Sequence, residues 1–196
     1  MRLFVALVPP PYVLDELEDF LAPYRSGPPE GLRWVGREQL HVTLTFLGEV
    51  DERTFERLLP RLQRAVARHE RLTLSLAGAG AFPGNGAHAR VLWSGLYGDR
   101  RELARLAAST SAAGRRLGVP PGKSRAFRPH LTLARCRVPV DVRPLLEPMS
   151  AFAGTPWTAD SVRLMESRLP AKGRTTVEHE AIRTWPLREP KAEPRS

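Results

Sequence analysis

Apolar residues along this chain follow two different periods, and each period predicts a different kind of element. Helical spacing of apolar residues predicts amphipathic helices at 12–22, 55–66 and 103–117, with Asp51 near the N-cap of the second. Alternation of apolar and polar residues, or a short apolar run, predicts β-strands at residues 3–8, 32–35, 40–47, 72–77, 91–96, 130–136, 161–166 and 175–182.

The connections between these elements decide the fold class. Residues 78–86 are rich in glycine and are predicted to form a loop. Helices separate some of the strands and short polar turns separate others, which favours an α+β fold with a mostly antiparallel sheet over a doubly wound parallel sheet. The strand pairs predicted to be hairpins are 32–35 with 40–47, and 161–166 with 175–182.

Length and composition suit one globular domain. The chain has 196 residues and 42% hydrophobic residues, with no apolar run long enough to span a membrane. Residues 186–196 are charged and proline-rich, and we expect a disordered tail there. Cys136 is the single cysteine, so an internal disulfide is impossible, which fits the reducing cytoplasm. We expect Cys136 to lie in or near the core.

The net charge of +9 favours a polyanionic partner, because phosphates are neutralised by basic side chains. Arginine far outnumbers lysine, however, and alanine, glycine and proline are abundant, which is also typical of compositional bias. The charge therefore supports a phosphate substrate without identifying one.

A four-residue pattern occurs twice, as His41-Val42-Thr43-Leu44 and as His130-Leu131-Thr132-Leu133. Side chains alternate between the two faces of a strand, so the histidine and threonine of each copy share a face and the aliphatic residues point into a core. Two imidazoles are what a reaction with a general acid and a general base requires near neutral pH. We therefore take His41 and His130 as candidate catalytic residues and Thr43 and Thr132 as candidate phosphate ligands.

Other interpretations of these motifs are weaker. A single His-x-Thr on a strand is usually a polar outer face, but the chain has only 5 histidines and two lie in matching motifs. Neither copy carries further ligands at metal-binding spacing, which disfavours zinc. Gly122-Lys123-Ser124 lacks the first P-loop glycine, because Leu117 stands there. The loop at 78–83 lacks the third glycine of a dinucleotide-binding turn.

Basic residues precede and follow the second motif. Lys123, Arg125 and Arg128 lie before His130, and Arg135 follows it, so these four are candidate contacts to an RNA backbone. The alternative is a solvated basic loop. Phe127 could stack on a base, although we favour a core position for it. The three other histidines lack a motif: we expect a structural role for His69 and surface positions for His88 and His179.

Taken together, these motifs resemble the 2H phosphoesterase superfamily, and within it the RNA 2',3'-cyclic phosphodiesterases, also called 2'-5' RNA ligase-like proteins. The resemblance covers nearly the whole chain. It departs where an aromatic residue is expected after Gly173-Arg174 and Thr175-Thr176 stand instead. The segments that carry it are residues 2–6, 40–48, 78–83, 90–93, 127–135 and 164–169.

The resemblance implies a single bilobal α+β domain over residues 1–185, with pseudo-twofold symmetry, two mostly antiparallel sheets, flanking helices and a central cleft. It implies hydrolysis of RNA 2',3'-cyclic phosphate ends, tRNA fragments among them, to 2'-phosphomonoesters, with no metal, cofactor, membrane or obligate protein partner. His41 would donate a proton to the leaving 3'-oxygen and His130 would deprotonate water. Thr43 and Thr132 would bind non-bridging oxygens.

Three alternatives stay open from the sequence. The chain could act on small cyclic nucleotides or on an ADP-ribose cyclic phosphate. It could also catalyse reversible 2'-5' RNA ligation. A non-catalytic RNA- or nucleotide-binding module belongs to a different class, and the presence of both complete motifs weighs against it.

Overall fold

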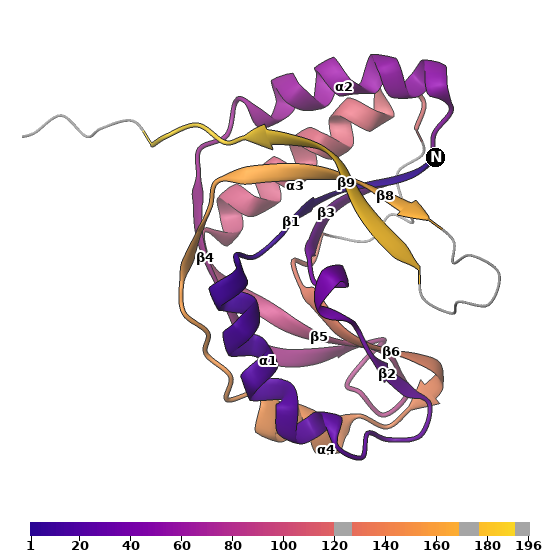
Figure 1. Cartoon of the computed structure of the whole chain (residues 1–196), viewed down its shortest axis with the longest axis vertical. Coiled ribbons are helices and arrows are strands. Elements are labelled where there is room, and N and C mark those ends of the chain that lie inside the picture. Colours follow the sequence, from indigo (N-terminus) through magenta and orange to yellow (C-terminus); the bar gives the residue numbers. More distant parts are fainter. Residues whose placement is uncertain (120–126, 169–176, 191–196) are drawn as a thin grey trace, which may run out of the picture.

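A computed structural model of the chain describes residues 1–119, 127–168 and 177–190. In this part of the chain, nine β-strands form one sheet and four α-helices pack around it (Figure 1). The strands are β1 (Arg2–Leu7), β2 (Leu32–Trp34), β3 (Val42–Glu49), β4 (Leu72–Phe82), β5 (Ala89–Gly98), β6 (Leu131–Val140), β7 (Trp157–Ala159), β8 (Ser161–Arg168) and β9 (Glu178–Pro186). The helices are α1 (Pro11–Arg25), α2 (Glu52–Val66), α3 (Arg100–Arg115) and α4 (Arg143–Met149).

The predicted α+β class is confirmed. The sheet order is β7-β4-β5-β6-β3-β1-β8-β9, with β2 added beside β6, and all of these strand pairs are antiparallel. In place of two separate sheets, the two halves form one continuous curled sheet. They meet between β3 and β6, the two strands that follow the motif histidines.

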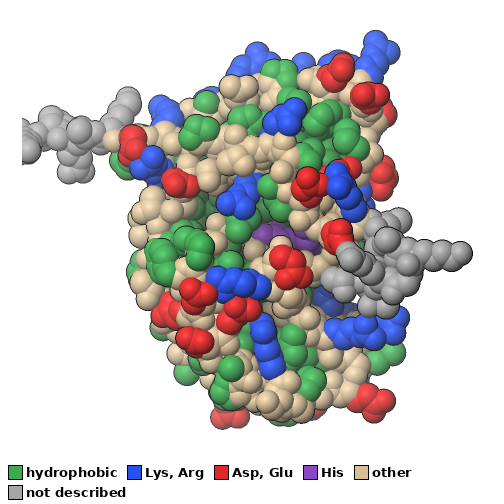
Figure 2. Space-filling view, in the orientation of Figure 1, with side chains coloured by type: hydrophobic (Ala, Val, Ile, Leu, Met, Phe, Trp, Pro, Cys, Tyr) green, Lys and Arg blue, Asp and Glu red, His purple; other side chains and the backbone are tan. Residues whose placement is uncertain are grey.

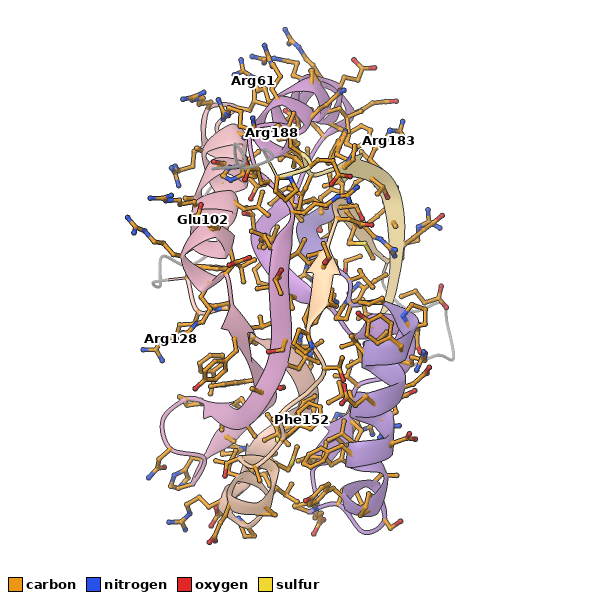
Figure 3. All side chains as sticks on the ribbon, turned by 90° about the vertical axis from the view of Figure 1, so that its left-hand side faces the viewer. Arg61, Glu102, Arg128, Phe152, Arg183 and Arg188 are labelled. Atoms are coloured by element: carbon orange, nitrogen blue, oxygen red, sulfur yellow. The ribbon has the colours of Figure 1, made fainter. Side chains whose placement is uncertain are left out.

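The three predicted helices bury the apolar faces that the sequence predicts, and α4 is a fourth helix that was not predicted. α2 and α3 lie side by side over one half of the sheet, and α1 and α4 lie at the other (Figure 1). The Asp51 carboxylate accepts a hydrogen bond from the Thr54 backbone N–H at 2.8 Å, so Asp51 caps α2 as predicted. Phe152 points toward α1 (Figure 3), where its ring lies 4.5 Å from that of Phe20. A large contiguous apolar core results, and Phe4, Ala6 and Met165 form a small second cluster.

One prediction about strand pairing and one about a loop were wrong. The strand at residues 32–35 does not form a hairpin with β3, because β2 pairs with β6 instead, in the register Trp34 to Ala134. Residues 78–82 are not a loop but the second half of β4, which pairs with β5. A strand is possible there because the small residues leave space for a side chain from β5, the indole of Trp93 over Gly80.

The predicted tail begins too early. Pro186 ends β9, and Leu187 is buried and donates its backbone N–H to Asp160. Residues 191–196 lie outside the described residues, as do the turn at 170–173 and Thr175–Thr176. Cys136 is buried, as expected.

Candidate active site

The two motif histidines lie at the junction of the two halves of the sheet. Val42 of β3 pairs with Leu131 of β6 in antiparallel register, and His41 and His130 each precede one member of this pair. An antiparallel pair has local twofold symmetry, so the two imidazoles reach the junction from opposite directions. The fold thus brings together the two motifs that the sequence places far apart.

Each imidazole is held by the same local hydrogen bond. The Nδ1 atom of His41 lies 2.7 Å from the carbonyl oxygen of Gln39, and the Nδ1 atom of His130 lies 2.6 Å from the carbonyl oxygen of Arg128. A carbonyl oxygen only accepts, so Nδ1 must carry the proton in both rings. The Nε2 atom of each ring remains to accept or donate a proton at a substrate.

The motif threonines are half-buried and pair with neighbouring strands. Thr43 is in register with Ala6 of β1, and Thr132 is in register with Trp93 of β5. In each strand the register shifts at the residue after the threonine, so the alternation of faces is interrupted there. As a result two consecutive residues are buried after each threonine, Leu44 with Thr45 and Leu133 with Ala134, and the threonine is the last motif residue on the histidine side.

The electrostatic environment of the site favours neutral histidines when no ligand is present. Burial lowers the pKa of His41 to about 4, and the positive charges of His179, Arg135 and His130 act in the same direction. Burial also lowers the pKa of His130, and Arg135 adds to this effect. None of the groups that shift these two values is a carboxylate. An anion is therefore the group that would restore charge balance here.

Arg135 is the cation that acts on both histidines. Its side chain is solvent-accessible, but protein atoms crowd the guanidinium enough that desolvation lowers its pKa. Among the described residues it has no ion-pair or hydrogen-bond partner. A guanidinium in this position is suited to bind a phosphate, whose oxygens match its fork of donors.

An aromatic pocket opens beside His130. The Phe82 ring lies 5.0 Å from that of His130 and 5.2 Å from that of Trp93. The pocket has a volume of about 270 Å³, enough for part of a nucleotide. Its lining residues are Phe82, Trp93, Arg100, Phe127, Arg128, Pro129 and His130.

Another set of aromatic rings surrounds His41. Phe4 lies 4.8 Å from His41 and 6.3 Å from Phe46, whose side chain is 61% exposed. His179 lies 5.4 Å from His41, with the two ring planes perpendicular. Figure 2 shows a histidine side chain (purple) at the bottom of a recess on this face of the molecule.

The expectation of a surface position for His179 was wrong, because β9 folds back beside β8 and places this ring against Phe4 of β1 and against His41, the residue before β3. No local pattern marks this histidine in the sequence. His88 is exposed, as expected, and His69 is half-buried with its Nε2 atom 2.8 Å from the Ser109 hydroxyl. This contact fits the structural role predicted for His69.

The structure places two of the four basic candidates at the site. Arg135 lies near both histidines, and Arg128 lines the pocket and projects from the side of the molecule opposite α1 (Figure 3). Lys123 and Arg125 lie outside the described residues. Phe127 packs against the core, as expected, and it also lines the pocket.

The described residues contain no group of three or more His, Cys, Asp or Glu side chains arranged to hold a metal ion. Nor do they include a helix with the length and hydropathy needed to cross a membrane.

The chain is similar in sequence to a defined group of proteins. A family model described as the 2'-5' RNA ligase superfamily matches residues 13–170. An RNA 2',3'-cyclic phosphodiesterase of Aeropyrum pernix is 35% identical over 164 residues, covering 82% of this chain and 88% of that protein. A protein of the same name from Archaeoglobus fulgidus is 34% identical over 174 residues, covering 88% of this chain and 94% of that protein.

Solved structures have the same fold. The crystal structure of TT0787 of Thermus thermophilus superposes with a TM-score of 0.77 at 28% identity, covering 96% of this chain and 99% of that one. The crystal structure of Escherichia coli LigT complexed with 3'-AMP superposes with a TM-score of 0.75 at 27% identity, covering 95% of this chain and 97% of that one.

Proposed function

Because this chain belongs to the 2'-5' RNA ligase superfamily, we propose that it is an RNA 2',3'-cyclic phosphodiesterase that opens the cyclic phosphate to a 2'-phosphomonoester. The observation that carries the proposal is the matched pair of imidazoles at the Val42–Leu131 junction, each held through Nδ1 with its Nε2 available. Relatives named RNA 2',3'-cyclic phosphodiesterase support the same activity.

The geometry suits an in-line displacement at phosphorus. The Nε2 atom of His130 takes a proton from water, the water oxygen forms a bond to phosphorus, and the bond from phosphorus to the 3'-oxygen breaks. The Nε2 atom of His41 gives its proton to that leaving oxygen. Thr43 and Thr132 donate hydrogen bonds to the non-bridging oxygens, and Arg135 offsets their charge.

His41 must gain its proton together with the substrate. Its pKa of about 4 keeps the ring neutral at neutral pH in the empty cleft. A bound phosphodiester brings a negative charge to the site, and an opposite charge within a few ångströms raises the pKa of an imidazole. Substrate binding would therefore prepare the acid that the reaction needs.

The proposed reaction uses imidazoles as acid and base and needs no metal ion. A five-membered cyclic phosphate is strained, which lessens the need for further activation of the phosphorus. The pocket beside His130 can accept a nucleotide base between aromatic rings, as single-stranded RNA recognition commonly requires. An RNA substrate also agrees with the net charge of +9, and we place the reaction in the cytoplasm.

The test is to incubate the protein, in EDTA, with a short RNA that ends in a 2',3'-cyclic phosphate, and to identify the product isomer by phosphatase sensitivity and mass. We expect a 2'-phosphomonoester. A product with a 3'-phosphate, or activity that disappears in EDTA and returns with zinc or magnesium, would contradict the proposal.

Parallel assays separate the other functions. A cyclic mononucleotide cleaved much faster than the RNA would point to small cyclic nucleotides, and an ADP-ribose cyclic phosphate tests the other small substrate. RNA binding without turnover of any substrate would indicate a binding module. Formation of a 2'-5' linkage from a 2',3'-cyclic end and a free 5'-hydroxyl would reveal ligation.

A further inference from the structure

The two motif histidines have different aromatic neighbours, although their backbone positions match. His130 lies in a group of three mutually close rings with Phe82 and Trp93, neither of which titrates. His41 also lies in a group of three close rings, but its partners are Phe4 and a second imidazole, His179. The titratable third ring therefore distinguishes the aromatic group around His41 from the one around His130.

His179 is itself held in a defined position. It pairs with Ser167 across β8 and β9, and its Nδ1 atom lies 3.3 Å from the Ser167 hydroxyl. Its ring stands edge-on to that of Phe4, with the centroids 5.0 Å apart. The ring is half-buried and contacts β1, β8 and the residue before β3, so packing restricts its rotation.

The charged groups that face His179 are cationic. Arg135 of β6 and Arg2 of β1 both oppose protonation of its ring, after burial, which is the largest effect. Glu166 of β8 and Glu180 of β9 form ion pairs with Arg168 at 3.0 and 2.7 Å. Glu178 and Glu180 both flank His179 on β9, so their side chains point to the opposite face of the strand.

We propose that His179 is a positioning residue for His41, which holds the His41 ring in place through the perpendicular ring contact and distinguishes the proton affinity of His41 from that of His130. The proposal rests on the proposed function, in which His41 and His130 have different roles. Phe4 and the perpendicular His179 ring restrict the tilt of the His41 ring, while the Gln39 carbonyl fixes its Nδ1. A protonated His179 repels a second proton on His41, whereas among the described residues the charged group that opposes protonation of His130 is Arg135 and not a second imidazole.

Three variants separate ring packing from charge. His179→Phe keeps a ring, His179→Gln keeps a polar group without titrating, and His179→Ala removes both. The matched control is His88→Ala, which removes an exposed histidine outside the site. The measurements are the imidazole titrations by NMR in the intact protein, and kcat and KM as functions of pH on the cyclic phosphate RNA.

We expect His179→Gln to raise the titration midpoint of His41 by about 0.5 pH unit or more, while that of His130 stays in place. This is the size of the Coulomb repulsion between two unit charges at the separation of the two rings, 5.4 Å, in water. The acid limb of kcat/KM should move in the same direction. His179→Ala should lower kcat by about 10- to 100-fold with little change in KM, and His179→Phe should recover most of that loss.

The result that would overturn the proposal is an unchanged His41 titration in His179→Gln, or a wild-type kcat in His179→Ala. Equal losses in His179→Ala and His179→Phe, with KM raised in both, would also overturn it, because His179 would then contact the substrate directly. The NMR titration does not depend on turnover. If the protein cleaves no cyclic phosphate, the proposed function fails, and the titration still decides the relation between His179 and His41.

Discussion

Phe46 and Arg135 occupy equivalent positions in the two halves of the sheet. Each stands five residues after its motif histidine, and each is in register with the neighbouring strand, Phe46 with Phe4 and Arg135 with Val91. The same backbone position thus carries an exposed aromatic ring in one half and a cation in the other. A symmetric frame in this way produces a site whose two sides differ chemically, which suits a substrate with a charged phosphate and an aromatic base.

Arg135 should contribute to phosphate binding. We expect Arg135→Ala to lower kcat/KM by about 10- to 100-fold, because hydrogen bonds to charged groups are worth about 1.5–3 kcal/mol. Arg135→Lys should retain more kcat/KM than Arg135→Ala but less than the wild type, since an ammonium group does not offer two parallel donors. Steady-state kinetics checks this, with Arg57→Ala on α2 as the control. Equal kinetics for Arg135→Ala and Arg57→Ala would remove Arg135 from the site.

The motif histidines should be indispensable for turnover but not for folding. We expect His41→Ala and His130→Ala each to lower the rate by about 10²- to 10⁴-fold, the usual contribution of a general acid or base. Circular dichroism should show native secondary structure in both variants, and His88→Ala should behave like the wild type. Near-normal turnover in a folded His41→Ala or His130→Ala protein would exclude the two-histidine mechanism.

The motif threonines should act through their hydroxyl groups. Valine keeps the branched shape and the strand preference of threonine and lacks only the hydroxyl. We therefore expect Thr43→Val and Thr132→Val to lower kcat by at most about 10²- to 10³-fold, while Thr→Ser at either position retains most of the activity. Single-turnover rates are the measurement. Unchanged rates in both valine variants would assign the threonines a purely structural role.

Acid should destabilise the protein through the histidines of the site. The folded-state pKa of His41 is about 4, below the unfolded value of about 6.5, so the unfolded chain binds more protons between these values. The stabilisation is fully present above about pH 6.5 and is lost as the pH falls toward 4, by up to about 3 kcal/mol for this group. Calorimetry across this range should show a falling Tm. His41→Phe should make the fall shallower, and an identical fall in that variant would place its origin elsewhere.

Gly80 should be required for the position of Trp93. A Cβ atom at residue 80 would lie 2.2 Å from the indole ring, so Gly80→Ala must displace it. We expect a loss of about 1–3 kcal/mol in the free energy of unfolding, as for other overpacked sites, and a raised KM because Trp93 lines the pocket. Chemical denaturation measures the first effect. Adding Trp93→Phe should restore stability to Gly80→Ala, and a failure to do so would mean that another contact is responsible.

Local patterns in the sequence predicted the parts of the fold that depend on local periodicity. Alternation identified β3 and β6, and helical spacing identified α2 together with its Asp51 cap. The partner of β2 depends on which strand lies beside it after folding, and nothing within residues 32–40 encodes that choice. The second half of β4 was missed because its small residues resemble those of a loop. In the structure Gly80 leaves room for the Trp93 ring and does not form a turn.

The same reasoning explains what was found and missed at the site. His41, His130 and the two threonines were found because each motif places them on one face of one strand. His179 was missed because its relation to His41 exists only through the pairing of β9 with β8 and of β8 with β1. Phe4 and Phe82 look like ordinary core residues in the sequence, and only the structure places them against the histidines.

The pairing of β3 with β6 consists of the single pair Val42–Leu131, whereas β4 with β5 and β8 with β9 pair along most of their length. A single pair resists bending less than a full ladder, so we expect bending of one half of the sheet against the other to concentrate at these two residues. The imidazoles next to them would move apart or together with such a motion. A ligand that touches both rings should therefore also stiffen the sheet.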